Sequence, residues 1–167
     1  MASSSTKLIA LFIPALLLMS CGSENAVEDA MEQQIEEETG GDANVDIDGD
    51  AVRIETDDGT FETGSASLPE NWPEDVSVYP EGKVTYSAVM NPSTGDSGMA
   101  FVITTNDSVE DVTDYYKDQL PADGWTMEAA MEAGTMVVLG GSKGERKVSL
   151  MITGSEDQTS VTVSVQE

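Results

Sequence analysis

The side chains that could carry chemistry in this 167-residue chain are mostly carboxylates. There are 32 Asp and Glu residues against 7 Lys and Arg, with no His and a single Cys, Cys21. Without His, the chain cannot form a Ser-His-Asp triad, a Cys-His pair or a zinc site with imidazole ligands. One Cys excludes an internal disulfide and a thiolate metal cluster. The formal net charge of −25 disfavours nucleic acid and anionic lipid headgroups as electrostatic partners.

An acidic run between residues 44 and 55 has the spacing of a calcium-binding loop. Its four candidate ligands are Asn44, Asp46, Asp48 and Glu55, with Gly49 at the position where the EF-hand pattern has its glycine. However, Asn stands where Asp is usual, and the flanking residues alternate with period two instead of forming amphipathic helices. Asp-Gly pairs between alternating runs are a strong signal for β-hairpins. We therefore expect a β-meander over residues 42–67, with calcium binding as the less favoured alternative.

Two further groups of side chains have the chemistry to bind a ligand. Lys143, Arg146 and Lys147 form the one basic cluster of the sequence, and we expect them to pair with nearby acids rather than to dock on an acidic surface. Four aromatic residues could line a sugar- or peptide-binding face: Trp72, Tyr115, Tyr116 and Trp125. Their spacing favours core packing for Tyr116 and Trp125. No nucleophile–base pair or metal constellation can be assembled, so we predict no catalytic residues and no enzyme activity.

Residues 1–20 have the pattern of a lipoprotein signal peptide that directs export. Lys7 precedes an apolar run over residues 8–19, which is too short to span a bilayer and is followed at once by polar, acidic sequence. The run ends in Leu18-Met19-Ser20-Cys21, which resembles the lipobox of bacterial lipoproteins. The resemblance implies cleavage after Ser20, a diacylglyceryl thioether on Cys21 and acylation of the new amino terminus. Several acyl chains anchor a protein stably, whereas one binds only marginally.

The resemblance also implies a location. It places the protein in the cell envelope, anchored to a membrane by lipid. Gly22 follows the cysteine, where an Asp often retains lipoproteins at the inner membrane, so we expect the outer membrane if the organism has two. In a bacterium with one membrane, we expect the outer face of the cell membrane.

Residues 21–41 predict an acidic helix or tether. Val27, Met31 and Ile35 form a narrow apolar stripe at helical spacing, surrounded by acids and stopped by two glycines. Packing of this stripe on the protein's own body is favoured, with a partner's helix and a flexible tether as alternatives. The absence of Lys and Arg argues against a membrane-surface helix.

Residues 68–167 predict an α+β domain. The segment at 68–80 contains three prolines, which forbid a central strand, and regular alternation begins after it. The expected order is two strands, one helix opening at Asp107 or Ser108, and four more strands. One antiparallel sheet with the helix packed on one face would bury a single core.

The pattern from Leu68-Pro and Trp72-Pro to Tyr115-Tyr and Gly124-Trp125 resembles a group of uncharacterised small bacterial lipoproteins, and the helix-on-sheet order is similar to helix-grip modules of outer-membrane assembly lipoproteins. Neither resemblance implies catalytic residues. We therefore predict a lipid-anchored, non-catalytic module that binds an envelope protein through a sheet face or edge. A module that binds a small ligand or ion, either calcium or a glycan, is the alternative.

Overall fold

A computed structural model describes residues 24–69, 71–90 and 97–166 of the chain. Its elements, in chain order, are α1 (Glu24–Thr39), β1 (Ala43–Asp48), β2 (Ala51–Thr56), β3 (Gly59–Thr63), β4 (Lys83–Met90), β5 (Gly98–Thr105), α2 (Val109–Ala122), β6 (Thr126–Ala133), β7 (Met136–Lys143), β8 (Arg146–Gly154) and β9 (Thr159–Gln166). Within the described residues, no helix is long and apolar enough to cross a membrane.

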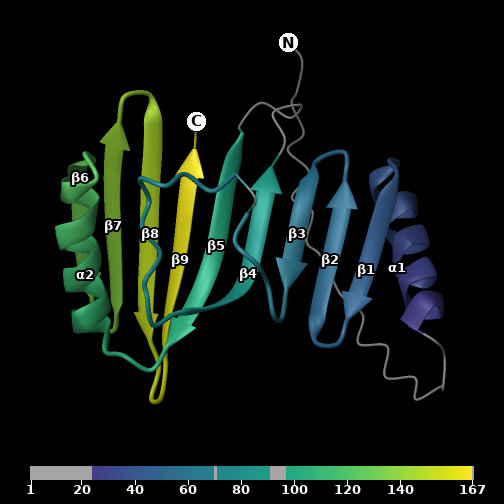
Figure 1. Cartoon of the computed structure of the whole chain (residues 1–167), viewed down its shortest axis with the longest axis horizontal. Helices are drawn as coiled ribbons and strands as arrows, with labels where there is room; N and C mark the ends of the chain where they lie inside the picture. Colours follow the sequence, from purple (N-terminus) through teal and green to yellow (C-terminus); the bar gives the residue numbers. More distant parts are fainter. Residues whose placement is uncertain (1–23, 70, 91–96, 167) are drawn as a thin grey trace, which may run out of the picture.

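The nine strands form one antiparallel sheet in the order β1-β2-β3-β4-β5-β9-β8-β7-β6 (Figure 1). Every neighbouring pair is antiparallel, and the crossover from β5 to β6 passes through α2. The last strand, β9, therefore lies in the middle of the sheet between β5 and β8. This confirms the predicted fold class, an α+β protein with an antiparallel sheet and a helix packed on one face.

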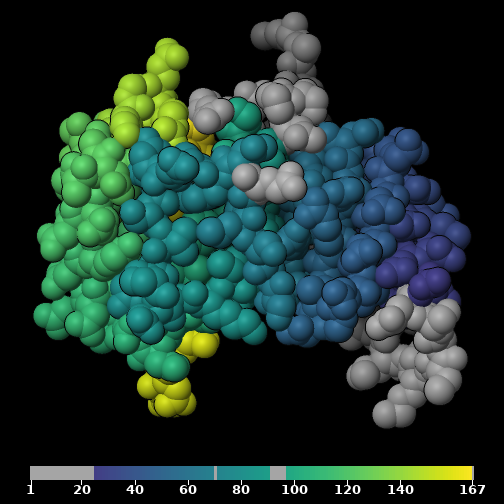
Figure 2. All heavy atoms as spheres, viewed as in Figure 1, coloured from purple at the N-terminus to yellow at the C-terminus, as the bar shows by residue number. Residues whose placement is uncertain are grey.

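The core lies between one face of β5 to β9 and two covering segments. Alternate residues of the strands point toward α2 and are fully buried, among them Phe101, Leu139 and Val163. From above, α2 contributes Val112, Tyr116 and Leu120, while the proline-rich segment at 64–82 contributes Val76 and Tyr79. Figure 2 shows this segment lying across the middle of the sheet beside α2. Because both covers pack on this same face, we call it the covered face.

Local sequence signals account for the ends of α2. The backbone N–H of Asp111 donates to the Ser108 side chain at 3.1 Å, which satisfies one of the free donors of the first turn. Glu110 and Asp111 place negative charge near the positive end of the helix dipole. Pro121 lies inside the last turn instead of ending the helix, and Gly124 follows with a φ of 89°.

The meander at β1 to β3 is continuous with the rest of the sheet, because β3 pairs with β4. Both hairpins exist, but the pairs Asp48-Gly49 and Asp58-Gly59 do not occupy the two central turn positions that Asp-Gly favours in hairpins. Each turn is displaced by one residue from its Asp-Gly pair, because Asp48 pairs with Ala51 and Thr56 pairs with Gly59. The turns are thus Gly49-Asp50 and Asp57-Asp58. The division of the chain at residues 67 and 68 stays a prediction.

Helix α1 lies against the outer edge strand, β1 (Figure 1). Met31 and Ile35 of its apolar stripe are half-buried, whereas Val27 remains 48% exposed. Val45 of β1 is buried at 4% exposure.

Candidate functional site

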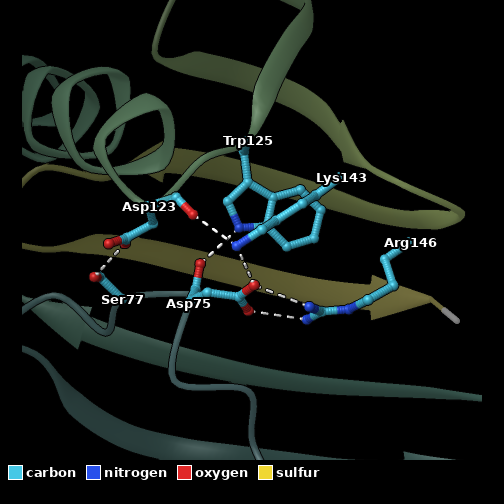
Figure 3. A network of polar contacts seen from close by, with 6 residues as sticks. All are labelled: Asp75, Ser77, Asp123, Trp125, Lys143 and Arg146. Atoms are coloured by element: carbon cyan, nitrogen blue, oxygen red, sulfur yellow. Dashed lines mark hydrogen bonds and ion pairs between the residues drawn. The ribbon is translucent and has the colours of Figure 1, made fainter.

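The largest polar network of the described residues joins the proline-rich segment to the β7–β8 hairpin (Figure 3). The Asp75 carboxylate accepts from Lys143 Nζ at 2.6 Å and from Arg146 Nη1 and Nη2 at 3.0 and 3.1 Å. Lys143 also donates to the Asp123 backbone oxygen at 2.7 Å, at the end of α2. Trp125 Nε1 donates to the Asp75 backbone oxygen at 2.6 Å.

One carboxylate pairs with both cations of this network. Hydrogen bonding from Arg146 is the main cause that lowers the pKa of Asp75 below its ordinary value, against the opposing effect of burial. The Arg146 guanidinium also lies 5.1 Å from the centre of the Trp125 ring, within the range of a cation–π contact. Lys143 and Arg146 therefore pair with an acid, as predicted, and hold the covering segment on the sheet. Lys147 points to the opposite face and is exposed.

The four candidate aromatic residues do not form an open binding face. Tyr116 and Trp125 are 0% and 3% exposed, as their spacing predicts. Trp72 packs edge-on against Phe101 with ring centres 4.6 Å apart, and its Nε1 donates to the Val76 backbone oxygen. Tyr115 is half-buried and donates to the Val78 backbone oxygen. All four thus help to pack the core and its covers.

The calcium candidates lie on a β-hairpin instead of a loop between helices. Asn44, Asp46 and Asp48 point to one side of β1, and Glu55 pairs with Asn44 from β2. Glu55 accepts from Arg53 at 2.6 Å, so its carboxylate has a cationic partner. No group of three or more metal-ligating side chains occurs in the described part of the chain. Cys21, the predicted lipid attachment site, lies outside the described residues.

Two open cavities flank the core. One, of about 610 Å³, lies at the start of α2 and the β8–β9 turn, and is bordered by Asp107, Glu156 and Asp157. The other, of about 410 Å³, lies between the meander and the start of the proline-rich segment, where Arg53 contacts Glu62. The space between α2 and the sheet is filled, because Phe101, Tyr116 and Leu139 are all 0% exposed.

The second face of β4 to β9, opposite α2, has an unusual composition, and we call it the open face. Strand register places rows of residues side by side across it; one row runs through Met131, Val138, Met151, Thr162, Val102 and Tyr86. A neighbouring row consists of small residues: Ala129, Gly140, Ser149, Ser164, Ala100 and, buried at its β4 end, Ala88. Met131 and Met151 are 58% and 43% exposed.

The paired positions of the open face carry no acid, although the chain has 32. The charged residues at these described positions are two exposed lysines, Lys83 and Lys147. A carboxylate reaches this face at its edge, where Glu128 in the bulge of β6 accepts from Ser142. Apart from these two lysines, the paired positions of the open face carry uncharged side chains, mainly small, hydroxyl and thioether groups, on a strongly acidic protein.

Sequence reasoning missed the open face, although a signal for it exists. Taken alone, the polar phase of each strand predicts a solvated back face. The same positions, read strand by strand, contain Ser, Thr, Ala, Gly and Met and almost no acids. Only the register across strands shows that these positions form one continuous surface.

A family model described as START domain-like matches residues 86–167, slightly less than half of the chain. The match begins within β4 and includes α2 and all strands that pack beneath it. It is consistent with the helix-on-sheet architecture described above. No curated protein and no solved structure gives a significant match.

Proposed function

We propose that this protein is a non-catalytic interaction module of the cell envelope, lipid-anchored through Cys21, which binds a partner protein on its open face. The observation that carries the proposal is the absence of acids from the paired positions of that face. A surface under selection for solubility alone would share the acidity of the rest of the molecule. Protein interfaces are depleted in charge at their centre and enriched in Met and aromatic residues.

The partner's contacting surface follows from the same composition. Because the side chains in one of its rows are small, a second sheet or a broad helix face can approach this surface closely. Exposed Met131 and Met151 supply adaptable apolar contacts, since thioether side chains fill irregular gaps. Lys83 and Lys147 at the rim favour a partner with acids at the matching positions, and such a partner would be repelled elsewhere on this protein.

The test is cross-linking of the lipidated protein in cells, followed by purification and mass spectrometry. The variant M131E/M151E places two acids on the open face, and Q33E/Q34E adds the same charge at exposed positions of α1. We expect one dominant envelope partner whose yield falls at least tenfold in M131E/M151E and is unchanged in Q33E/Q34E. Equal yields from both variants would overturn the assignment of the open face.

Membrane anchoring is tested in the same cells by fractionation. We expect the variant Cys21→Ser to leave the membrane pellet, because it removes the thiol that the lipid requires. Retention of Cys21→Ser in the pellet would contradict lipid anchoring without bearing on the open face.

The START domain-like match favours ligand binding as a second candidate function. Both cavities have the volume of a small-molecule pocket, which is typically about 300–1,000 Å³, and the one beside α2 is the larger of the two. Its border is acidic, so this candidate is a module for a cationic or neutral polar ligand such as a glycan. Buried Trp125 and the half-buried, core-packed Trp72 disfavour a glycan platform of stacked tryptophans.

A further inference from the structure

The contact between α1 and β1 has a regular geometry at the edge of the sheet. Three glutamates of α1, spaced four residues apart, accept from alternate backbone N–H groups of β1. Glu28 accepts from Ile47 at 2.9 Å, and Glu32 accepts from Val45 at 2.8 Å. Glu36 accepts from Ala43 at 3.4 Å.

The spacing explains why the two elements match. Four residues of an α-helix rise about 6 Å, and two residues of a strand rise about 6.6 Å. Successive glutamates therefore meet successive outward N–H groups along an antiparallel helix–strand pair. These N–H groups point away from β2, so they are the ones that an additional strand would use.

The cover that α1 provides is incomplete. A carboxylate only accepts hydrogen bonds, so it serves the outward N–H groups of β1 and not the outward carbonyl oxygens. None of the described side chains of α1 is buried, and Val27 is 48% exposed. The helix contains seven acids and no base, and it lies beside a strand that itself carries Asp46 and Asp48.

We propose that the edge of β1 is a strand-addition site for an extended peptide segment of alternating basic and apolar residues, and that α1 is the cover which this segment displaces. An added strand would serve both the N–H and the carbonyl groups of Ala43, Val45 and Ile47. Its basic residues would lie beside Asp46 and Asp48, and its apolar residues beside Val45 and Ile47 on the other side of the strand. This site is separate from the open face of β4 to β9.

Fluorescence anisotropy tests the site with the full chain and a labelled peptide of sequence Lys-Val-Lys-Ile-Lys-Val-Lys. The control peptide has the same composition in block order, Lys-Lys-Lys-Lys-Val-Ile-Val, so it keeps the charge and loses the alternation. We expect the alternating peptide to bind at least tenfold more tightly. Equal affinity for both peptides would show that charge alone accounts for the binding, and it would overturn the proposal.

Two matched variants separate uncovering of the edge from electrostatics. E28A/E32A/E36A removes the three acceptors, and D29A/E37A/E38A removes three exposed acids of the same helix. Both lose the same charge, which weakens attraction for a basic peptide. We expect E28A/E32A/E36A nevertheless to bind the alternating peptide about tenfold more tightly than D29A/E37A/E38A does. Equal or weaker binding by E28A/E32A/E36A would contradict displacement of α1.

A third variant addresses the strand itself. Ile47→Pro deletes an outward N–H without removing a bond between β1 and β2, and we expect it to weaken peptide binding several-fold. M131E/M151E on the open face should leave peptide binding unchanged. Failure of the peptide experiment and failure of the partner experiment are therefore distinguishable.

Discussion

At the scale of single residues, Asp75 connects the proline-rich segment to three residues that are distant in the sequence. Its carboxylate joins two cations from the β7–β8 hairpin, and its backbone oxygen accepts from Trp125. Asp75 and Arg146 are about a quarter exposed, so their interaction is partly screened by water. Nε of Arg146 is buried and forms no hydrogen bond within the described residues, which increases its dependence on this one carboxylate.

We expect Asp75→Asn to lower the free energy of unfolding at pH 7 by about 1–2 kcal/mol, because it removes charge-assisted hydrogen bonds from two cations. The pKa of Asp75 is lowered in the folded state from an ordinary 3.8. Its stabilisation is therefore complete above about pH 4 and is lost as the pH falls through the lowered pKa. Urea unfolding followed by tryptophan fluorescence, from pH 7 to pH 2, measures both effects.

The exposed Asp157 in the β8–β9 turn provides the control. Asp157→Asn changes the charge equally and should shift the urea midpoint by much less than Asp75→Asn does. If the two variants unfold alike at pH 7, then the Asp75 network does not hold the proline-rich segment on the sheet.

At the scale of elements, the junction between β3 and β4 depends on Gly59. A Cβ at this position would lie 2.0 Å from the Val89 backbone oxygen, and the residue has a φ of 152°. Gly49, in the first turn of the meander, has a φ of 65° with open space around it. We expect Gly49→Ala to cost about 1 kcal/mol of strain and Gly59→Ala about 3 kcal/mol, because a clash with backbone is added. Urea unfolding of the two variants compares them, and equal costs would show that β3 can move away from β4.

The elements differ in how well sequence predicts them. Alternation with period two predicts β4, β5, β6, β8 and β9, and the spacing of Val112, Tyr116 and Leu120 predicts the buried stripe of α2. For β7, the apolar run at 136–139 predicts only the first half, because the two glycines after it favour a turn where the strand continues to Lys143. These signals are local, since each arises within a single element. The predicted positions of the two meander turns are each wrong by one residue, because an Asp-Gly pair can satisfy turn geometry in more than one register. The contact of Asp75 with Arg146 spans 71 positions, so no local pattern indicates it.

At the scale of the whole molecule, the acids are unevenly distributed. Residues 21–75 contain 18 acids and one base, whereas residues 76–167 contain 14 acids and five bases. In the described structure, this asymmetry follows the sheet: α1 and the meander are at one end, and the α2-covered strands are at the other (Figure 1). The acidic end carries the β1 edge, and the open face belongs to the less acidic end. The two proposed binding surfaces therefore lie in regions of different charge.

This distribution makes the stability of the molecule depend on ionic strength. A net charge of −25 destabilises the compact state through self-repulsion, and salt shortens the range of that repulsion from about 20 Å near 20 mM to about 4 Å near 0.5 M. We expect sodium chloride over this range to raise the free energy of unfolding by roughly 1–2 kcal/mol in urea titrations. Choline chloride should act equally, because screening does not depend on the identity of the cation.

One millimolar calcium at constant ionic strength is the control. Added stabilisation that saturates would indicate a bound ion at Asn44, Asp46, Asp48 and Glu55. No added effect would leave screening as the cause. A fall in stability with sodium chloride would instead mean that the ion pairs around Asp75 and Arg53 outweigh the repulsion among the unpaired acids.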